Sequence, residues 1–253
     1  METHSQKNFR VTRLLGSVAL LGAGAGATVW LSPGGLGEAD ATEVTKGASA
    51  SAYRSVAGAV ADVPAWMASL LEVAGGGTLV ILGLLLVRLC WTAVRRKDAA
   101  GAAGAVVIGV GTVAAYAISE ALKLVVDEER PCRALRGVEA ITDCPPTGDW
   151  SFPSNHATLA AALAVGLAML WPRLATLTLS LAGAAALLRV LVGVHYPHDV
   201  LAGAILGGTV VAAVLLAVMP LGVRATSLLV RRWWEHDPGL VGHDGGSGPV
   251  VDA

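Results

Sequence analysis

Residues 155–221 decide the fold of this chain, and they read NHATLAAALAVGLAMLWPRLATLTLSLAGAAALLRVLVGVHYPHDVLAGAILGGTVVAAVLLAVMPL. The stretch is almost entirely Ala, Leu, Val and Gly, with polar interruptions at Trp171–Arg173 and His195–Asp199. It therefore contains three apolar runs, each close to the roughly 20 residues that a helix needs to cross a bilayer. We expect three consecutive transmembrane helices here.

The rest of the chain repeats this pattern. Its 253 residues are 54% hydrophobic and only 15% charged, with a mean hydropathy of +0.63, whereas an ordinary soluble domain carries about 25% charged residues. The composition excludes a water-soluble globule and predicts an all-α, polytopic membrane protein with a bundle of six transmembrane helices. We place the six spans at Leu14–Leu31, Ala68–Leu89, Ala99–Val126, Asn155–Trp171, Leu174–Val194 and Val200–Leu221.

Charge and cysteine content exclude other classes of protein. The formal net charge of −1 rules out a strongly basic nucleic-acid binder. The three cysteines lack the CxxC spacing of a zinc site. The partner that remains is the lipid bilayer, and the oligomeric state is left open.

Lys and Arg in the connecting loops predict the orientation. The larger set lies on one side of the spans and contains Lys7, Arg10, Arg13, Arg88, Arg95, Arg96, Lys97, Arg173, Arg224, Arg231 and Arg232. The opposite side has Lys46, Arg54, Arg130, Arg133 and Arg136. We therefore expect a multi-pass protein of the cell membrane with both termini in the cytoplasm.

This topology divides the chain into residues 1–13, a cytoplasmic N-terminus, residues 14–222, the membrane domain, and residues 223–253, a cytoplasmic and largely disordered tail. Ala39-Asp40-Ala41 resembles a signal-peptide cleavage site. The apolar run before it is long and ends well upstream, which favours an uncleaved anchor. In the long outer loop of residues 32–66, Tyr53, Val56 and Val60 have helical spacing, which predicts a helix lying on the membrane surface.

Ionisable residues are rare in such a chain, so their positions are informative. They form three clusters: Lys123 with Arg130-Pro131, then Pro153-Ser154-Asn155-His156, then Arg189 with His195 and Asp199. In the predicted topology all three clusters lie at the outer ends of helices. One face of the membrane thus collects Lys, Arg, His and Asp side chains into a candidate active site.

These residue types suit phosphoryl transfer. A lysine and two arginines bind a multiply charged oxyanion, and arginine gives forked hydrogen bonds to phosphate. Ser154 and Asn155 open a helix whose free N–H groups favour an anion. A histidine four residues before an aspartate can have one ring nitrogen held by the carboxylate and the other free to attack. A second histidine can protonate a leaving alkoxide.

At these residues the sequence resembles the type 2 phosphatidic acid phosphatase superfamily, which also includes vanadium-dependent haloperoxidases. The family pattern is Lys-x6-Arg-Pro, then Pro-Ser-Gly-His, then Ser-Arg-x5-His-x3-Asp. This chain reads KLVVDEERP from Lys123, PSNH from Pro153 and LRVLVGVHYPHD from Leu188, in the same order.

The resemblance implies a role for each matched residue. His195 would be the nucleophile, Asp199 would orient it, and His156 would be the general acid. Lys123, Arg130 and Arg189 would hold the phosphoryl oxygens, helped by Ser154 and the backbone at Asn155. The family needs neither a metal nor another cofactor for hydrolysis.

Two positions depart from the family pattern. Asn155 replaces the glycine, and because Asn tolerates a left-handed backbone we expect the turn to persist. Leu188 replaces the serine before Arg189 and removes one hydroxyl.

Some neighbouring residues have competing interpretations. His198 competes with His195 as the nucleophile, although its adjacency to Asp199 suits local pairing poorly. Asp127-Glu128-Glu129 suggests either a magnesium site or, as we expect, a solvated stretch. Glu120 lies one turn before Lys123 and is expected to pair with it.

The expected function is hydrolysis of a lipid phosphate or diphosphate at the outer face through a phosphohistidine. A polyprenyl diphosphate, phosphatidic acid and phosphatidylglycerol phosphate are all plausible substrates. A lipid phosphotransferase would use the same residues. A transporter would instead carry ionisable residues near helix centres, whereas here they cluster at helix ends.

The cysteines give one further prediction. Cys132 and Cys144 lie in the second outer loop, on the side that is oxidising in bacteria, and we expect them to form a disulfide. Cys90 lies at the cytoplasmic end of the second span and should stay reduced.

Overall fold

The computed structural model describes residues 4–34, 41–138 and 140–235. Within these ranges the chain is all-α, as predicted, and its extended segments form one isolated bridge between Thr42 and Glu128. The elements are α1 (His4–Leu31), α2 (Ala48–Val60), α3 (Ala65–Arg95), α4 (Ala99–Val126), α5 (Pro131–Ala134), α6 (Asn155–Leu170), the 3₁₀ turn η1 (Pro172–Leu174), α7 (Ala175–Leu191) and α8 (Pro197–Glu235).

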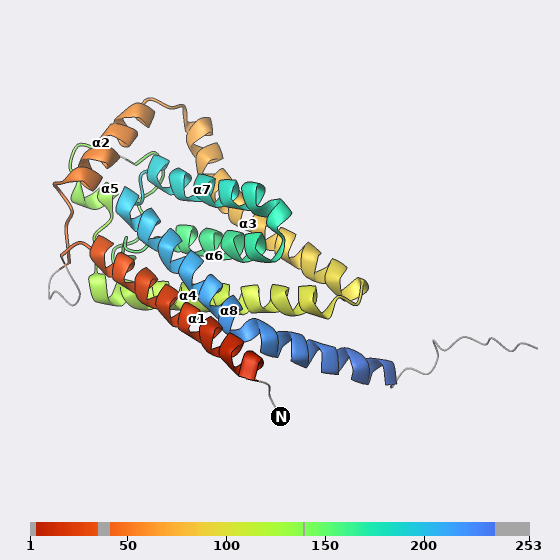
Figure 1. The fold of residues 1–253 in the computed structure, drawn as a ribbon. Coiled ribbons are helices and arrows are strands. Elements are labelled where there is room, and N and C mark those ends of the chain that lie inside the picture. The colour runs from red at the N-terminus through yellow and green to blue at the C-terminus, as the bar shows by residue number, and fades with distance from the viewer. Residues whose placement is uncertain (1–3, 35–40, 139, 236–253) are drawn as a thin grey trace, which may run out of the picture.

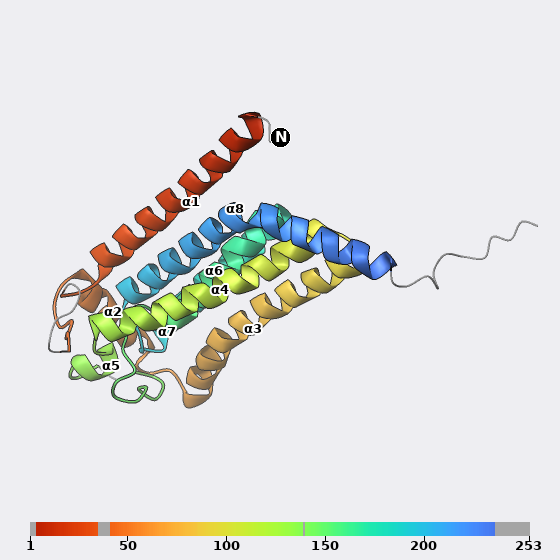
Figure 2. The ribbon, with the colours of Figure 1, turned by 90° about the horizontal axis from the view of Figure 1, so that it is seen from below.

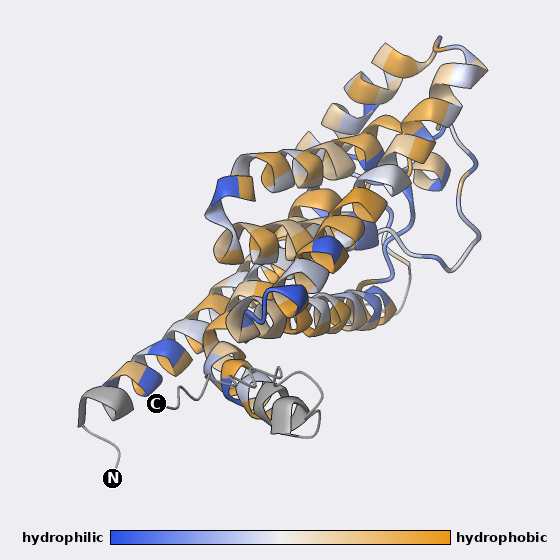
Figure 3. Ribbon diagram, turned by 90° about the vertical axis from the view of Figure 1, so that its right-hand side faces the viewer, coloured by the Kyte–Doolittle hydropathy of each residue, from blue (hydrophilic) through white to orange (hydrophobic). Residues whose placement is uncertain are grey.

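The long helices have the length and composition of membrane spans, which makes the chain a multi-pass membrane protein. α1, α3, α4, α7 with the preceding turn, and α8 each contain a sufficiently apolar segment. α6 is equally apolar but only 16 residues long, about 24 Å at 1.5 Å per residue. The count of six spans therefore stays a prediction. Figure 3 shows apolar residues along the helices and hydrophilic residues mostly at their ends and in the loops.

Three helices form the interior of the bundle. α6 packs extensively on α8, and both pack on α4 (Figures 1 and 2). About half of the most apolar window of α4 and of α8 is buried, against 17% for α1, α3 and α7. The outer helices thus turn apolar side chains outward, as a lipid environment permits. α1 packs on α8, and the C-terminal part of α8 turns away from it (Figure 2).

Glycine allows the closest of these contacts. A Cβ atom at Gly203 would lie 2.5 Å from the carbonyl oxygen of Ser154, and one at Gly207 would lie 2.1 Å from that of Thr158. Both contacts are far shorter than real carbon–oxygen contacts, so α8 approaches the α6 backbone only because these side chains are absent. The approach also fixes the start of α6 against the start of α8.

A layer of short elements covers this end of the bundle. α2 forms where helical spacing was expected, and its buried face packs on other parts of the chain. Its expected position on the membrane surface stays a prediction. Tyr53 is fully buried, packs against Tyr196 with the two rings tilted and their centroids 5.7 Å apart, and donates a hydrogen bond to the Gly193 carbonyl at 2.8 Å. The expected surface helix is therefore a cover over the turn that carries His195.

Two expectations fall at the edges of the described ranges. α8 continues to Glu235, past the boundary expected at residue 222, and residues 236–253 of the tail lie outside the described residues. The Ala39-Asp40-Ala41 segment lies outside them as well, except for Ala41.

Candidate active site

The structure brings the three clusters of the sequence to one end of the bundle. Lys123 lies in the last turn of α4 and Arg189 in the last turn of α7. Ser154 precedes α6 and His156 is its second residue. His195 lies in the turn between α7 and α8, and Asp199 lies in the first turn of α8.

His195 has the arrangement of an oriented nucleophile. Its Nδ1 lies 3.3 Å from Asp199 Oδ2, and its Nε2 lies 3.3 Å from Arg130 Nη1. The same Asp199 oxygen accepts hydrogen bonds from the Tyr196 N–H at 2.8 Å and from the Ser151 hydroxyl. A carboxylate held this way keeps the proton on Nδ1, so the lone pair on Nε2 points toward the guanidinium group.

Burial keeps this imidazole neutral. The His195 side chain is 3% exposed, and burial, with the charges of Arg130 and Arg189, lowers its pKa to about 3 despite the opposing effect of its hydrogen bond to Asp199. At neutral pH the ring therefore carries a free lone pair, which a nucleophile requires.

Arg130 and Lys123 form a cationic site beside His195. Arg130 Nη2 lies 3.0 Å from Asp149 Oδ1, and Lys123 Nζ lies 3.1 Å from the same oxygen. Arg130 is also fixed by its hydrogen bonds to the carbonyls of Asp149 at 2.7 Å and Val194 at 3.0 Å. Lys123 lies 3.6 Å from Glu120, the pairing expected from the sequence.

Asp149 was not anticipated as part of the site. Burial alone would raise the pKa of its carboxyl group, but the charges of Arg130 and Lys123 outweigh burial and lower the pKa below its usual value. An anionic oxygen thus lies between the two buried cations, one of which, Arg130, also contacts Nε2 of His195. This oxygen marks where a phosphoryl oxygen would be held.

The remaining predicted residues surround this position. Arg189 Nε and Ser154 Oγ are buried, and neither has a hydrogen-bond partner among the described residues. Buried polar groups are normally paired, so both are available to a ligand. His156 is half-buried and lies within electrostatic reach of Arg189 and the other two cations.

Asn155 differs from the expected backbone conformation. It is helical and not left-handed, since the described non-glycine residues with positive φ are Lys97 and Asp127. Its side chain accepts a hydrogen bond from Ser119 at 2.8 Å and donates one to Glu120. The side chain thus ties α6 to α4, and only its backbone N–H remains a candidate for binding phosphate.

A second buried carboxyl group, that of Glu128, contacts Asp199. Glu128 was expected in a solvated stretch, but its side chain is fully buried. His198 Nε2 lies 3.2 Å from Glu128 and 3.2 Å from Asp199 Oδ1, and Ser49 contacts His198 Nδ1 at 2.6 Å. Burial and the neighbouring Asp199 raise the pKa of Glu128 well above its usual range.

A protonated Glu128 accounts for this arrangement. Two buried carboxylates in contact cannot both ionise cheaply, and one proton shared between Glu128 and Asp199 would satisfy the oxygens that otherwise lack a hydrogen-bond partner. His198 therefore contacts the far oxygen of Asp199, while His195 contacts the near one. This geometry separates the two histidines that competed as nucleophile.

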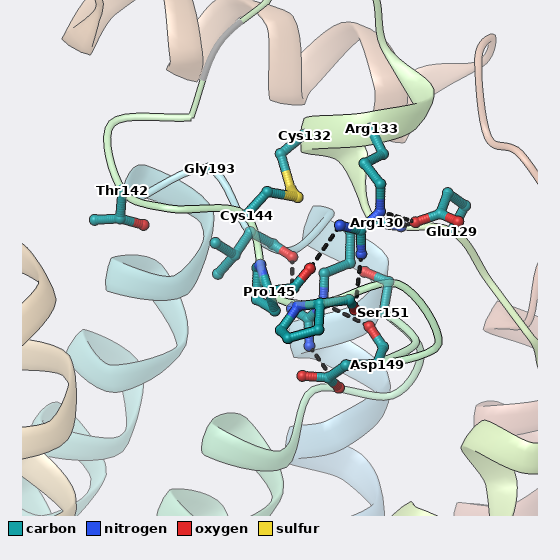
Figure 4. Close-up of a disulfide and its surroundings, with 12 residues drawn as sticks. Glu129, Arg130, Cys132, Arg133, Thr142, Cys144, Pro145, Asp149, Ser151 and Gly193 are labelled. Atoms are coloured by element: carbon teal, nitrogen blue, oxygen red, sulfur yellow. Dashed lines mark hydrogen bonds and ion pairs between the residues drawn. A yellow bond between two sulfur atoms is a disulfide. The ribbon is translucent and has the colours of Figure 1, made fainter.

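A disulfide fixes the loop that carries Asp149 (Figure 4). Cys132 and Cys144 are bonded, with their Cα atoms 6.0 Å apart. Arg133 donates hydrogen bonds to the carbonyls of Pro145 at 2.6 Å and Pro146 at 3.0 Å, and its Nε contacts Glu129 at 2.6 Å. Both links join α5 to residues 144–149, so the Arg130 guanidinium and Asp149 are held by the same framework.

Sequence reasoning missed the loop residues of the site. Asp149 and Ser151 belong to no motif and to no periodic segment, and their contacts depend on a loop path that spacing cannot predict. The carboxyl group of Glu128 made it a candidate functional residue, but the acidic residues on both sides of it suggested that it is exposed to solvent.

Comparisons with known proteins find relatives of part of the chain. Residues 104–222 match the family model described as the PAP2 superfamily. The chain is 43% identical over 110 residues to a decaprenylphosphoryl-5-phosphoribose phosphatase of Mycobacterium tuberculosis, covering 43% of this chain and 58% of that protein. It is 43% identical over 58 residues to a lipid A 1-phosphatase of Rhizobium etli, covering 23% of this chain and 25% of that protein.

One solved structure also matches the chain. It is the crystal structure of a transmembrane PAP2 type phosphatidylglycerolphosphate phosphatase from Bacillus subtilis, with 19% identity and a TM-score of 0.45, covering 88% of this chain and 98% of that one.

The segment matched by the family model contains all three motifs, from Lys123 to Asp199. Over this segment, slightly less than half of its length, the chain is similar to the PAP2 superfamily. The matched segments span little more than half of the mycobacterial relative and a quarter of the rhizobial one.

Proposed function

We propose that this protein is a membrane-integral phosphatase that removes phosphate from a lipid phosphate or diphosphate through a phosphohistidine. One observation carries the proposal. A neutral, oriented His195 points its Nε2 at Arg130, and Arg130 with Lys123 already holds a carboxylate oxygen. A nucleophile beside a preformed oxyanion site is the arrangement that phosphoryl transfer requires.

In the first step His195 Nε2 attacks phosphorus and the bond from phosphorus to the lipid oxygen breaks. His156 donates its proton to that oxygen, which leaves as the lipid alcohol or, from a diphosphate, as the lipid monophosphate. In the second step water attacks the phosphohistidine, His156 accepts the proton, and inorganic phosphate forms. Asp199 stabilises the imidazolium character that develops on His195.

The cations stabilise the charge on the transferring group. Lys123 and Arg130 exchange the Asp149 carboxylate for phosphoryl oxygens, and the unpartnered Nε of Arg189 gains an acceptor. Removing one such donor typically costs about 100- to 1,000-fold in rate. We therefore expect losses of this size from Lys123→Ala, Arg130→Ala and Arg189→Ala.

The named activities of the relatives support a phosphorylated lipid as the substrate. One acts on a decaprenylphosphoryl-5-phosphoribose and another on lipid A. A lipid substrate fits a site at the ends of the spans, because its headgroup reaches that depth by lateral diffusion. We place a phosphorylated polyprenyl sugar beside polyprenyl diphosphate, phosphatidic acid and phosphatidylglycerol phosphate as candidates.

The test is phosphate release by the purified full chain from these four lipids in detergent. His195→Ala should abolish turnover, and vanadate should inhibit the unsubstituted protein. His156→Ala should still form phosphoenzyme from a substrate with a good leaving group. Full activity of His195→Ala, or loss of less than about threefold in all three cation variants, would refute the assignment.

Labelled water separates hydrolysis from transfer. In H₂¹⁸O, hydrolysis gives inorganic phosphate with one ¹⁸O from solvent. A phosphotransferase gives a new phosphorylated lipid or sugar without the label.

A further inference from the structure

A second cationic cavity lies between α1 and α8, away from the catalytic residues. It encloses about 170 Å³ and is lined by three arginines, Arg10, Arg13 and Arg224, together with Leu14, Leu216, Ala217, Pro220 and Leu221. None of these lining residues carries a carboxylate. The cavity therefore combines three positive charges with apolar walls.

Proline explains how this cavity is built. Pro220 lies inside α8 and has no N–H, so the carbonyl of Leu216, four residues earlier, lacks its helical donor. Arg13 Nε donates to that carbonyl at 3.0 Å. This bond fastens α1 to α8 and fixes the Arg13 guanidinium in the wall of the cavity. Arg13 thus has a structural role as well as a charge.

The cavity lies about one membrane thickness from the catalytic residues. Asp199 and Pro220 are 21 residues apart on the same helix, about 31 Å at 1.5 Å per residue, and the hydrocarbon core is about 30 Å thick. If the catalytic residues face one leaflet, the three arginines lie at the headgroup level of the other. Basic pockets between membrane helices are sites for anionic headgroups.

We propose that this cavity binds the phosphate group of an anionic phospholipid from the leaflet opposite the catalytic residues. Arg10, Arg13 and Arg224 contact the phosphate, and Leu14, Leu216 and Leu221 contact its glycerol and upper acyl chain. The exposed Leu14 and Leu221 continue the apolar wall onto the lipid-facing surface, at 54% and 63% exposure. A free phosphate would leave these apolar walls unused, so the chemistry favours a lipid.

The occupant would stabilise the contact between α1 and α8. α1 packs mainly on α8, and the C-terminal part of α8 bends away from it (Figure 2). A phosphate held by arginines from both helices would bridge them where they separate. Loss of the lipid should therefore loosen α1 without touching the catalytic residues.

The test is native mass spectrometry of the full chain in detergent with dioleoyl phosphatidylglycerol, and separately with dioleoyl phosphatidylcholine. The protein should retain one phosphatidylglycerol in preference to phosphatidylcholine. At about 1 kcal/mol for each arginine, Arg10→Gln/Arg224→Gln should weaken retention roughly 30-fold. Arg95→Gln/Arg173→Gln removes the same charge outside the cavity and should leave retention unchanged.

Further arms identify where the lipid is bound. Arg189→Gln should leave the bound phosphatidylglycerol in place. A large excess of inorganic phosphate over the lipid should not displace it. Unchanged retention in Arg10→Gln/Arg224→Gln would overturn the proposal. Three other results would also overturn it. Equal loss of lipid in the control pair would indicate nonspecific charge attraction, and loss in Arg189→Gln would indicate binding at the catalytic residues. Displacement by phosphate would indicate a site for a free anion.

Discussion

Asp149 contacts both Lys123 and Arg130 through one carboxylate oxygen, so a phosphorylated ligand has to replace it. The side chain is 45% exposed and can move toward solvent, whereas the two cations are buried. Asp149 therefore occupies the position that we propose for a phosphoryl oxygen of the substrate.

Replacing this anion gives the first prediction. Asp149→Asn should lower the KM for a lipid phosphate by about three- to tenfold, because two charge-assisted contacts no longer compete with substrate. The kcat should change little. Asp143→Asn removes the same charge from an exposed position of the same loop and should leave KM unchanged. A higher KM in Asp149→Asn would show that this carboxylate assists binding.

Glu128 gives the second prediction. If its carboxyl group is protonated, Glu128→Gln preserves a donor toward Asp199 and should keep kcat within about twofold. Glu128→Ala leaves a buried carboxylate oxygen unpaired, which costs about 1–3 kcal/mol, so kcat should fall about tenfold or more. Asp127→Asn is the control at the neighbouring position and should leave kcat unchanged. An equal fall in kcat in Glu128→Gln and Glu128→Ala would mean that Glu128 acts as an anion.

The site residues that sequence analysis predicted have local spacing patterns, whereas those that it missed reach the site through loops or tertiary packing. His195 and Asp199, or Lys123 and Arg130, have spacings set by local backbone geometry, so their patterns can be recognised. Asp149 reaches the site through a loop path, and Glu128 is buried in contact with His198 and Asp199. Neither contact has a local signature. The helical spacing around Tyr53 predicted a helix correctly, but not the surface that it covers.

Among the elements, α5 and the loop of residues 144–149 depend on covalent and ionic links. Closing a loop of about 13 residues is worth about 3 kcal/mol in the chain-entropy model. Cys132→Ser/Cys144→Ser should therefore lower the melting temperature and raise KM, since Arg130 and Asp149 lose a common anchor. Cys90→Ser, at a free cysteine, should change neither quantity.

Mass spectrometry tests this link directly. Non-reduced, alkylated protein from cells with normal envelope oxidation should yield a joined peptide that contains Cys132 and Cys144. Recovery of the two peptides as separate alkylated species would refute the bridge in the cell.

The contact between α6 and α8 gives the next prediction. Gly207→Ala would place a methyl group against the Thr158 carbonyl, at a distance that forces the helices apart. Overpacking of this kind costs about 1–3 kcal/mol, and it should also reduce kcat because the same contact positions Ser154. Gly109→Ala, where nothing lies within 4 Å, is the control. Thermal unfolding in detergent measures the difference.

For the whole molecule, the distribution of cations predicts orientation. The end that carries Arg95, Arg96 and Arg173 has the higher density of positive charge in short connections, so it should be cytoplasmic. In a Cys90→Ser background, Asp62→Cys should react with a membrane-impermeant maleimide in intact cells. Arg96→Cys should react only after permeabilisation. The reverse pattern would place the catalytic residues on the cytoplasmic side.

The carboxylate of Asp149, which is tethered to the site by its loop, also affects product release in the proposed reaction. In the proposed reaction, inorganic phosphate would have to leave the site against the attraction of two buried cations. A tethered competitor acts at an effective concentration in the millimolar range, so the loop itself can help to expel the product. A lipid substrate resists the same competition, because its chains keep the headgroup at the site between encounters. The loop thus favours turnover over product inhibition, and it does so without distinguishing one lipid from another.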